Sequence, residues 1–407
     1  MASAPGTEFN VPDHVPPELV RNVGLMLNPE FLADPYDFLP KLHDTMPPVY
    51  YDTDPRMGGG WVTIKHDLAF KALRNSENLT IETTQIFPRD PDPEKYFHLI
   101  PQELDPPIHR KFRNVLDPYL SPRAVLALEN DIRTLANDLI DKFIDKGECE
   151  FGAEFARPLP VTVFLRFMGL PLEMTEQFVT WVVALIKFAE RDLAVKIMGE
   201  IKEYMTGVIE EKRKNPDDGA ISHIVHGRID GEPLKERDIY GFVFFLFIAG
   251  IDTVFAALNN SWVWLARNPD RRHEMIADPG NIDNQAEELL RMFGVTFSGR
   301  TLIKDYELGG VQMKKGERIM ALLPACNYDP DVFPNPREVR FDRPRTPILS
   351  FTGGVHACMG AHLARLEYKI ALQEWLRRIP DFEIKPGTDI RYPPSGVVGP
   401  ETVHLVW

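Results

Sequence analysis

The sequence has few cysteines, no leading apolar segment and no excess of positive charge. Its three cysteines, Cys149, Cys326 and Cys358, are too few for a disulfide framework and favour a reducing compartment. The first ten residues contain neither a basic patch nor an apolar stretch, so no signal peptide is predicted. The longest apolar run, 242–251, is too short to span a bilayer. We therefore expect a soluble, cytoplasmic protein without a membrane segment.

The low positive charge and the lack of repeats exclude further classes of partner and of fold. The net charge of −14 at pH 7 argues against nucleic acid as a partner. No repeat or low-complexity linker divides the chain, so residues 1–407 are expected to form one monomeric domain, with 1–30 extended over its surface. Helical spacing of apolar residues dominates, above all in 234–268, whereas alternation at 48–52 and 60–65 predicts a β-hairpin. The predicted fold class is mainly α with minor β.

A glycine-rich loop brings one cysteine to the start of a predicted helix. The stretch 351–360 has the sequence FTGGVHACMG, and helical spacing follows from 362 onward. Glycines permit a tight loop, and a helix N-terminus stabilises a thiolate. No second cysteine lies at zinc-finger or iron–sulfur spacing from Cys358, so a single metal-bound thiolate, as in axial haem ligation, is the favoured interpretation. The alternative is a buried, inert cysteine.

A second unusual segment lies inside the long helix. Residues 249–253, AGIDT, interrupt an apolar helix, and the glycine alone costs about 1 kcal/mol there. Gly250 allows a flat ligand to approach closely, and Thr253 can donate to a backbone carbonyl and open the helix. The alternative is a buried Asp252 paired with a cation, next to a threonine that only bends the helix.

These two segments together resemble the cytochrome P450 family, in particular its soluble, bacterial, class I branch with the camphor hydroxylases. Phe351, Gly354, Cys358 and Gly360 match the haem-ligand loop, and 249–253 matches the oxygen-activation motif. The resemblance implies a helical triangular prism with haem b between the long helix and the cysteine helix. It also implies a monooxygenase whose iron is bound by the thiolate of Cys358.

The resemblance extends from about residue 30 to 407 and implies roles for further side chains. Thr253 would hydrogen-bond dioxygen, Asp252 would relay protons, and Lys187 could pair with Asp252 and gate it. The implied haem contacts are Cys358, Phe351 and Gly250, with His109, Arg113, Arg300 and His356 for the propionates. A serine, Ser298, replaces an acid of the camphor hydroxylases.

An ion-pair triad is implied as a support for the cysteine loop. Glu288 and Arg291 are three residues apart and can pair on one face of a helix. In the family an arginine from the irregular segment before the cysteine loop joins this pair, and Arg340 matches that position. We expect a structural role for the triad.

The residues expected to line the substrate site are mostly apolar, which favours a small hydrophobic molecule bound by its shape. They are Phe87, Tyr96, Phe97, Phe245, Ile248, Val295, Thr296, Val397 and Val398. Phe97 stands where the camphor hydroxylases have the tyrosine that binds the ketone, unless Tyr96 takes that place. A phenylalanine there favours an ether or hydrocarbon substrate, such as a monoterpenoid.

The sequence contains no flavin or reductase segment, so electrons are expected from a [2Fe–2S] ferredoxin and its reductase. An acidic ferredoxin would be attracted by a basic patch. The expected members of this patch are Arg74, Arg110, Arg113, Arg345 and Arg365. Two other functions stay open: a peroxygenase that uses H₂O₂, against which the Asp252–Thr253 pair argues, and a non-enzymatic haem-based gas sensor.

Overall fold

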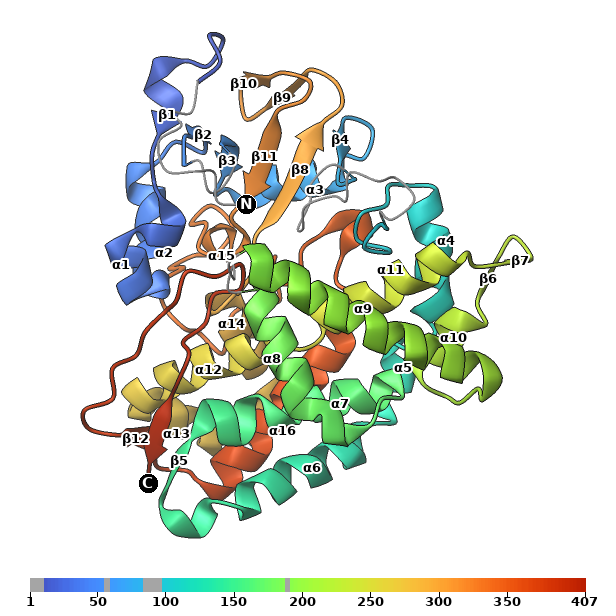
Figure 1. The fold of residues 1–407 in the computed structure, drawn as a ribbon. Coiled ribbons are helices and arrows are strands. Elements are labelled where there is room, and N and C mark those ends of the chain that lie inside the picture. Colours follow the sequence, from blue (N-terminus) through green and yellow to red (C-terminus); the bar gives the residue numbers. More distant parts are fainter. Residues whose placement is uncertain (1–10, 55–58, 83–96, 187–190) are drawn as a thin grey trace.

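Helices make up most of the molecule, and the largest sheet lies at one end (Figure 1). The computed structural model describes residues 11–54, 59–82, 97–186 and 191–407. The helices are α1 (Pro29–Ala33), α2 (Pro35–Thr45), α3 (His66–Arg74), α4 (Ile108–Leu116), α5 (Pro122–Leu126), α6 (Glu129–Asp141), α7 (Pro158–Met168), α8 (Thr175–Ile186), α9 (Arg191–Lys214), α10 (Ala220–Val225), α11 (Glu236–Ala249), α12 (Asp252–Arg267), α13 (Pro269–Ala277), α14 (Ile282–Met292), α15 (Leu323–Cys326) and α16 (Ala361–Arg378). This confirms the predicted class, mainly α with minor β.

The main sheet joins strands from both ends of the chain. Its order is β1 (Val20–Arg21), β2 (Val49–Asp52), β3 (Gly60–Thr63), β11 (Arg318–Ala321), β8 (Ser298–Leu302) and β4 (Leu79–Thr80). The predicted hairpin is confirmed, because β2 and β3 pair antiparallel with Val49 opposite Thr63. The parallel pairing of β11 with β3 joins segments about 250 residues apart, and no local pattern predicts it.

Smaller strand pairs complete the fold. A three-stranded sheet has the order β12 (Glu383–Ile384), β13 (His404–Val406) and β5 (Glu148–Glu150). Two hairpins are formed by β6 (Arg228–Ile229) with β7 (Glu232–Pro233), and by β9 (Tyr306–Leu308) with β10 (Val311–Met313). The three-stranded sheet ties the last residues to the middle of the chain.

The N-terminal segment is anchored at a few positions, although most of residues 11–30 are partly or fully exposed. Residues 11–30 contain β1, which pairs in parallel with β2, and Val15, Val23 and Leu25 are buried. These short apolar stretches lack periodicity because they pack against the sheet and not along one face of a helix. Residues 1–10 lie outside the described part.

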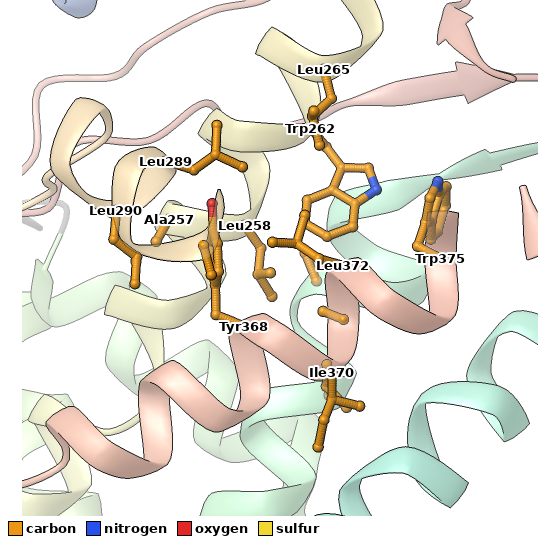
Figure 2. Close-up of a cluster of buried hydrophobic side chains, with 14 of the residues drawn as sticks. Ala257, Leu258, Trp262, Leu265, Leu289, Leu290, Tyr368, Ile370, Leu372 and Trp375 are labelled. Carbon is orange, nitrogen blue, oxygen red and sulfur yellow. The ribbon is translucent and has the colours of Figure 1, made fainter. Parts of the chain in front are cut away.

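The largest core cluster lies between α12 and α16 (Figure 2). Trp262 and Trp375 are fully buried, with ring centroids 5.9 Å apart and planes perpendicular. The Tyr368 hydroxyl donates to Ser261 across the same interface. Burying a large apolar side chain stabilises a fold by about 1.5–3 kcal/mol, so this cluster holds the helix after the cysteine loop against the central helix.

The predicted long helix is broken into α11 and α12 at Gly250 and Ile251. A Cβ at Gly250 would lie 2.3 Å from the Phe164 ring on α7, so this glycine is needed for helix packing. By length and composition the combined segment Glu236–Arg267 could cross a membrane, but 61% of its apolar window is buried. That burial is expected of a core helix.

Candidate active site

One row of side chains along α11 and α12, which we call the stripe, is accessible, although most residues of these two helices are buried. Phe245, Ile248, Ala249, Asp252 and Thr253 are partly or fully exposed, whereas the residues between them are mostly buried. They follow the i, i+3, i+4 spacing of one helical face. The stripe is apolar at its start and polar at its end, beyond the break.

Thr253 makes the hydrogen bond that the sequence predicts. Its Oγ1 donates to the carbonyl of Ala249 at 3.4 Å, one turn earlier, across the break at Gly250. Gly250 also permits a close approach of the Phe164 ring, and its contact with a cofactor stays a prediction. Lys187, the predicted partner of Asp252, lies outside the described residues.

The cysteine loop is tightly constrained by backbone geometry. Gly354 has φ of +71°, and a Cβ there would lie 2.5 Å from the Leu73 carbonyl, so only glycine fits. The Cys358 N–H donates to the Phe351 carbonyl at 3.0 Å, and α16 begins three residues later. The loop thus presents Cys358 just before a helix, as predicted.

The Cys358 thiol is accessible, but its surroundings disfavour the charged form. Its side chain is exposed, yet desolvation raises its pKa, against the lowering effect of the Gly360 N–H and of Arg113 and Arg365. A thiolate preformed by the helix alone is therefore not observed; a bound metal ion deprotonates such a thiol.

Four basic side chains, two histidines and two arginines, gather beside this loop. The rings of His109 and His356 lie 4.3 Å apart. Desolvation, followed by repulsion from Arg300, His109 and Arg113, lowers the pKa of His356 to about 2. Desolvation also lowers the pKa of His109 to about 4 and that of Arg300 to about 10. Burial beside the arginines therefore keeps the two histidines uncharged near pH 7. The positive charge of the cluster comes from Arg113 and Arg300, and it suits the cluster to an anionic group.

Unpaired donors in the cluster support the same conclusion. Among the described residues, Nη2 of Arg300 and Nε2 of His356 are buried without a hydrogen-bond partner. Ser298 stands where the camphor hydroxylases have an acid. Its hydroxyl accepts from Nη1 of Arg300 at 3.1 Å and so orients that guanidinium. Carboxylates such as the propionates of haem fit these donors.

The triad that supports the cysteine loop contains a different arginine from the one predicted. Arg291 binds both carboxylate oxygens of Glu288 at 2.8 Å, and Nε of Arg343 binds both at 3.1 Å. Only the backbone N–H of Arg340 reaches Glu288, and its side chain pairs with Asp342 in solvent. The segment is irregular, so no periodicity distinguishes Arg340 from Arg343.

The predicted substrate residues fall into two groups. Phe245 and Ile248 lie on the accessible stripe. The Val398 N–H donates to the Val295 carbonyl at 2.8 Å, and this pairing buries both of these side chains in core clusters. Their chain neighbours, Thr296 and Val397, are partly accessible. Val295 and Val398 therefore pack in the core clusters, and their contact with a substrate stays a prediction.

The loop residue Phe97 packs against the central helix. Its ring meets the rings of Tyr240 and Phe244 edge to face, at 4.6 and 5.4 Å. Both partners are buried and lie off the accessible stripe. Phe97 therefore anchors its loop to α11, and Phe87 and Tyr96 lie outside the described residues.

Comparison with known proteins decides the family. The model of the family Cytochrome P450 matches residues 282–404. Over 406 residues the chain is 34% identical to the probable cytochrome P450 127A1 of Sinorhizobium fredii, covering 98% of this chain and 97% of that protein. The chain belongs to the cytochrome P450 family. This P450 is also 30% identical over 341 residues to the methyl-branched lipid omega-hydroxylase of Mycobacterium tuberculosis, covering 79% of this chain and 78% of that protein.

A solved structure agrees with the fold of this P450. The crystal structure of CYP101J2 superposes with a TM-score of 0.85 at 32% identity, covering 98% of this chain and 99% of that one. The P450 fold, the enzymatic monooxygenase class and the haem cofactor are thereby confirmed. Cys358 would be the thiolate that binds the haem iron, because it is exposed whereas Cys149 and Cys326 are buried. The gas-sensor alternative is set aside.

Proposed function

We propose that this P450 hydroxylates a small hydrophobic molecule, a monoterpenoid or related terpenoid, with O₂ and electrons from a [2Fe–2S] ferredoxin and its reductase. In this proposal the chain acts as a single cytoplasmic domain and a monomer. The observation that carries it is the accessible stripe, which is apolar at Phe245, Ile248 and Ala249 and polar at Asp252 and Thr253. A hydrophobic molecule fits the first part and proton transfer fits the second.

The two parts of the stripe would have different functions, substrate binding and proton transfer. Phe245 and Ile248, with Thr296 and Val397, would hold a substrate by shape, since they offer few hydrogen-bond donors. Bound haem supplies the activation of O₂, with Cys358 as the electron-rich ligand. Thr253 holds a proton at Oγ1 and now shares it with the Ala249 carbonyl. Asp252 would bring protons from solvent to this hydroxyl.

The propionate side of the haem would rest on the cationic cluster. The unpaired polar atoms of Arg300 and His356 would be satisfied by carboxylates, and His109 lies against His356. Arg113 donates to the carbonyl of Ala357 and so braces the backbone next to Cys358. These residues would orient the cofactor and offset its charge.

The basic patch proposed for ferredoxin is weaker than its arginine count suggests. Arg365 pairs with Glu287 at 2.8 Å, and Arg110 lies 3.4 Å from Asp117. These acids cancel part of the charge that would attract an acidic partner. We expect docking with a modest dependence on ionic strength, and the ferredoxin remains a proposal.

The relatives suggest one different substrate class. The name of the Mycobacterium relative indicates methyl-branched lipids, and an apolar stripe also suits an acyl chain. Optical titration separates the two classes, because a substrate that displaces iron-bound water shifts the haem from low to high spin. Monoterpenoids should produce that shift at micromolar levels, and a response restricted to long-chain lipids would contradict the terpenoid proposal.

Carbon monoxide binding and oxygen uptake test the reaction itself. Reduced protein under carbon monoxide should show the red-shifted Soret band of thiolate ligation, and Cys358→Ala should abolish it. Cys149→Ala, at a buried cysteine away from the loop, is the matched control. Oxygen uptake that requires ferredoxin and reductant supports the monooxygenase route, whereas turnover with H₂O₂ alone at the same rate would support a peroxygenase.

A further inference from the structure

A second ion pair joins α14 to α16, the helix that follows the cysteine loop. Arg365 lies on α16, seven residues after Cys358, and Glu287 lies on α14, next to Glu288 of the triad. Nε and Nη2 of Arg365 donate to the two carboxylate oxygens of Glu287, each at 2.8 Å. A pair with two parallel hydrogen bonds fixes the plane of the guanidinium as well as its position.

The fixed guanidinium lies over the ring of the first residue of the cysteine loop. Its Cζ atom is 4.2 Å from the centre of the Phe351 ring, which is within the range of cation–π contacts. The carbonyl of Phe351 in turn accepts a hydrogen bond from the Cys358 N–H at 3.0 Å. Phe351 therefore connects the ion pair to the backbone of the residue that carries the sulfur.

The backbone next to Phe351 has a conformation that needs support from its surroundings. Thr352 has φ of +55°, in the left-handed region that residues with a side chain rarely adopt. Among the described residues, its hydroxyl is buried without a hydrogen-bond partner. Such a conformation persists only where neighbouring groups hold the chain in place. The contact of Arg365 with Phe351 holds the residue directly before it.

We propose that Arg365, held by Glu287, is a positioning residue for Cys358: its guanidinium stacks on Phe351 and so fixes the loop that presents the sulfur. The two adjacent acids of α14 then have separate partners, Glu288 in the triad and Glu287 at the loop itself. Arg365 acts by its geometry, so a lysine with the same charge is no substitute. This inference rests on Cys358 as the haem ligand, which Cys358→Ala tests separately.

The carbon monoxide complex of the holoenzyme, reduced with dithionite so that no ferredoxin is needed, tests the proposal. Loss of thiolate ligation converts the red-shifted Soret band to an unshifted one, and the rate is followed well below the unfolding temperature. We expect Arg365→Met and Glu287→Gln each to speed this conversion by roughly tenfold. The double variant should be no faster than either single variant, and Arg365→Lys should recover little of the loss.

Lys369→Met is the matched control. Lys369 lies one turn further along α16 and also pairs with an acid of α14, Asp283, at 3.3 Å, so the Soret conversion should keep the parent rate.

The iron–sulfur stretching frequency and the unfolding midpoint separate positioning from general stability. The frequency should shift in Arg365→Met and Glu287→Gln but not in the control. The midpoint should change no more than in the control, because the pair of Arg365 with Glu287 is partly exposed and contributes little to global stability.

Full rescue by Arg365→Lys, or an equal effect of Lys369→Met, would overturn the inference. Thiolate ligation that is present in Arg365→Met with the parent rate and frequency would do the same while leaving Cys358 as the ligand. If Cys358→Ala keeps the red-shifted band, the ligand assignment fails, and this inference fails with it.

Discussion

At the residue scale, a buried carboxylate with two arginines holds the segment before the cysteine loop. Arg291, Arg343 and Glu288 are each less than a tenth exposed. Removing one partner of a buried pair costs about 3–5 kcal/mol because the other charge loses its compensation. We expect Arg343→Ala to lower stability by about 3 kcal/mol and to weaken haem retention, measured by thermal unfolding and by the Soret band.

Arg340→Ala is the matched control for that prediction. Its guanidinium pairs with Asp342 in solvent, where ion pairs contribute little. The melting temperature of Arg340→Ala should equal that of the parent protein. Equal losses in both variants would contradict the assignment of Arg343 to the triad.

A second residue-scale prediction concerns pH. Asp329 accepts from Nζ of Lys65 at 2.7 Å and from the His66 N–H at 2.9 Å. Although burial raises the pKa of Asp329, these donors lower it below its usual value of 3.8 in the net balance. A folded pKa below the unfolded one means stability that is present above about pH 4 and lost as pH falls through the folded pKa.

Lys65→Met checks the sign of this effect. We expect a loss of about 1 kcal/mol at pH 7, since partial exposure of Lys65 screens the pair. The difference between the parent and Lys65→Met should shrink as the pH is lowered from 5 to 3 in urea unfolding experiments. A difference that grows with acidification would contradict the lowered pKa.

At the element scale, the break between α11 and α12 depends on the packing of α7. A methyl group at residue 250 would overlap the Phe164 ring, and such overpacking costs about 1–3 kcal/mol. Gly250→Ala should therefore destabilise the fold by at least this amount, measured by chemical unfolding. Gly250→Ala combined with Phe164→Leu should recover much of the loss relative to Phe164→Leu alone, because the smaller side chain leaves room.

At the scale of the whole molecule, the last strand joins distant parts of the chain. Leu405 on β13 is fully buried, and β13 lies between β12 and β5. Leu405→Ala should cost about 2–5 kcal/mol, as large-to-small core changes do. His404→Ala, at the exposed neighbour, should leave the unfolding midpoint unchanged. Similar shifts in both variants would mean that the strand does not bury its side chain as described.

Predictions from the sequence were confirmed where the interacting residues lie within one short segment of the chain. The loop around Cys358, the bond from Thr253 to Ala249 and the β2–β3 hairpin all depend on residues a few positions apart. Predictions failed where the outcome depends on distant partners. Arg343 replaces Arg340 in the triad because the deciding neighbour, Glu288, comes from another part of the chain. The packing of Phe164 against Gly250 likewise depends on a distant residue.

The sequence by itself determined the kind of metal ligand and the mainly helical class, since local glycines, helical periodicity and a lone thiol carry that information. Only the tertiary structure decided which face of the central helix stays accessible and how deeply the basic side chains expected at the propionates are buried. His109, Arg300 and His356 come from three separated segments, and their burial together lowers their pKa values. Burial and like-charge repulsion are properties of the packed chain, so no local pattern could have expressed them.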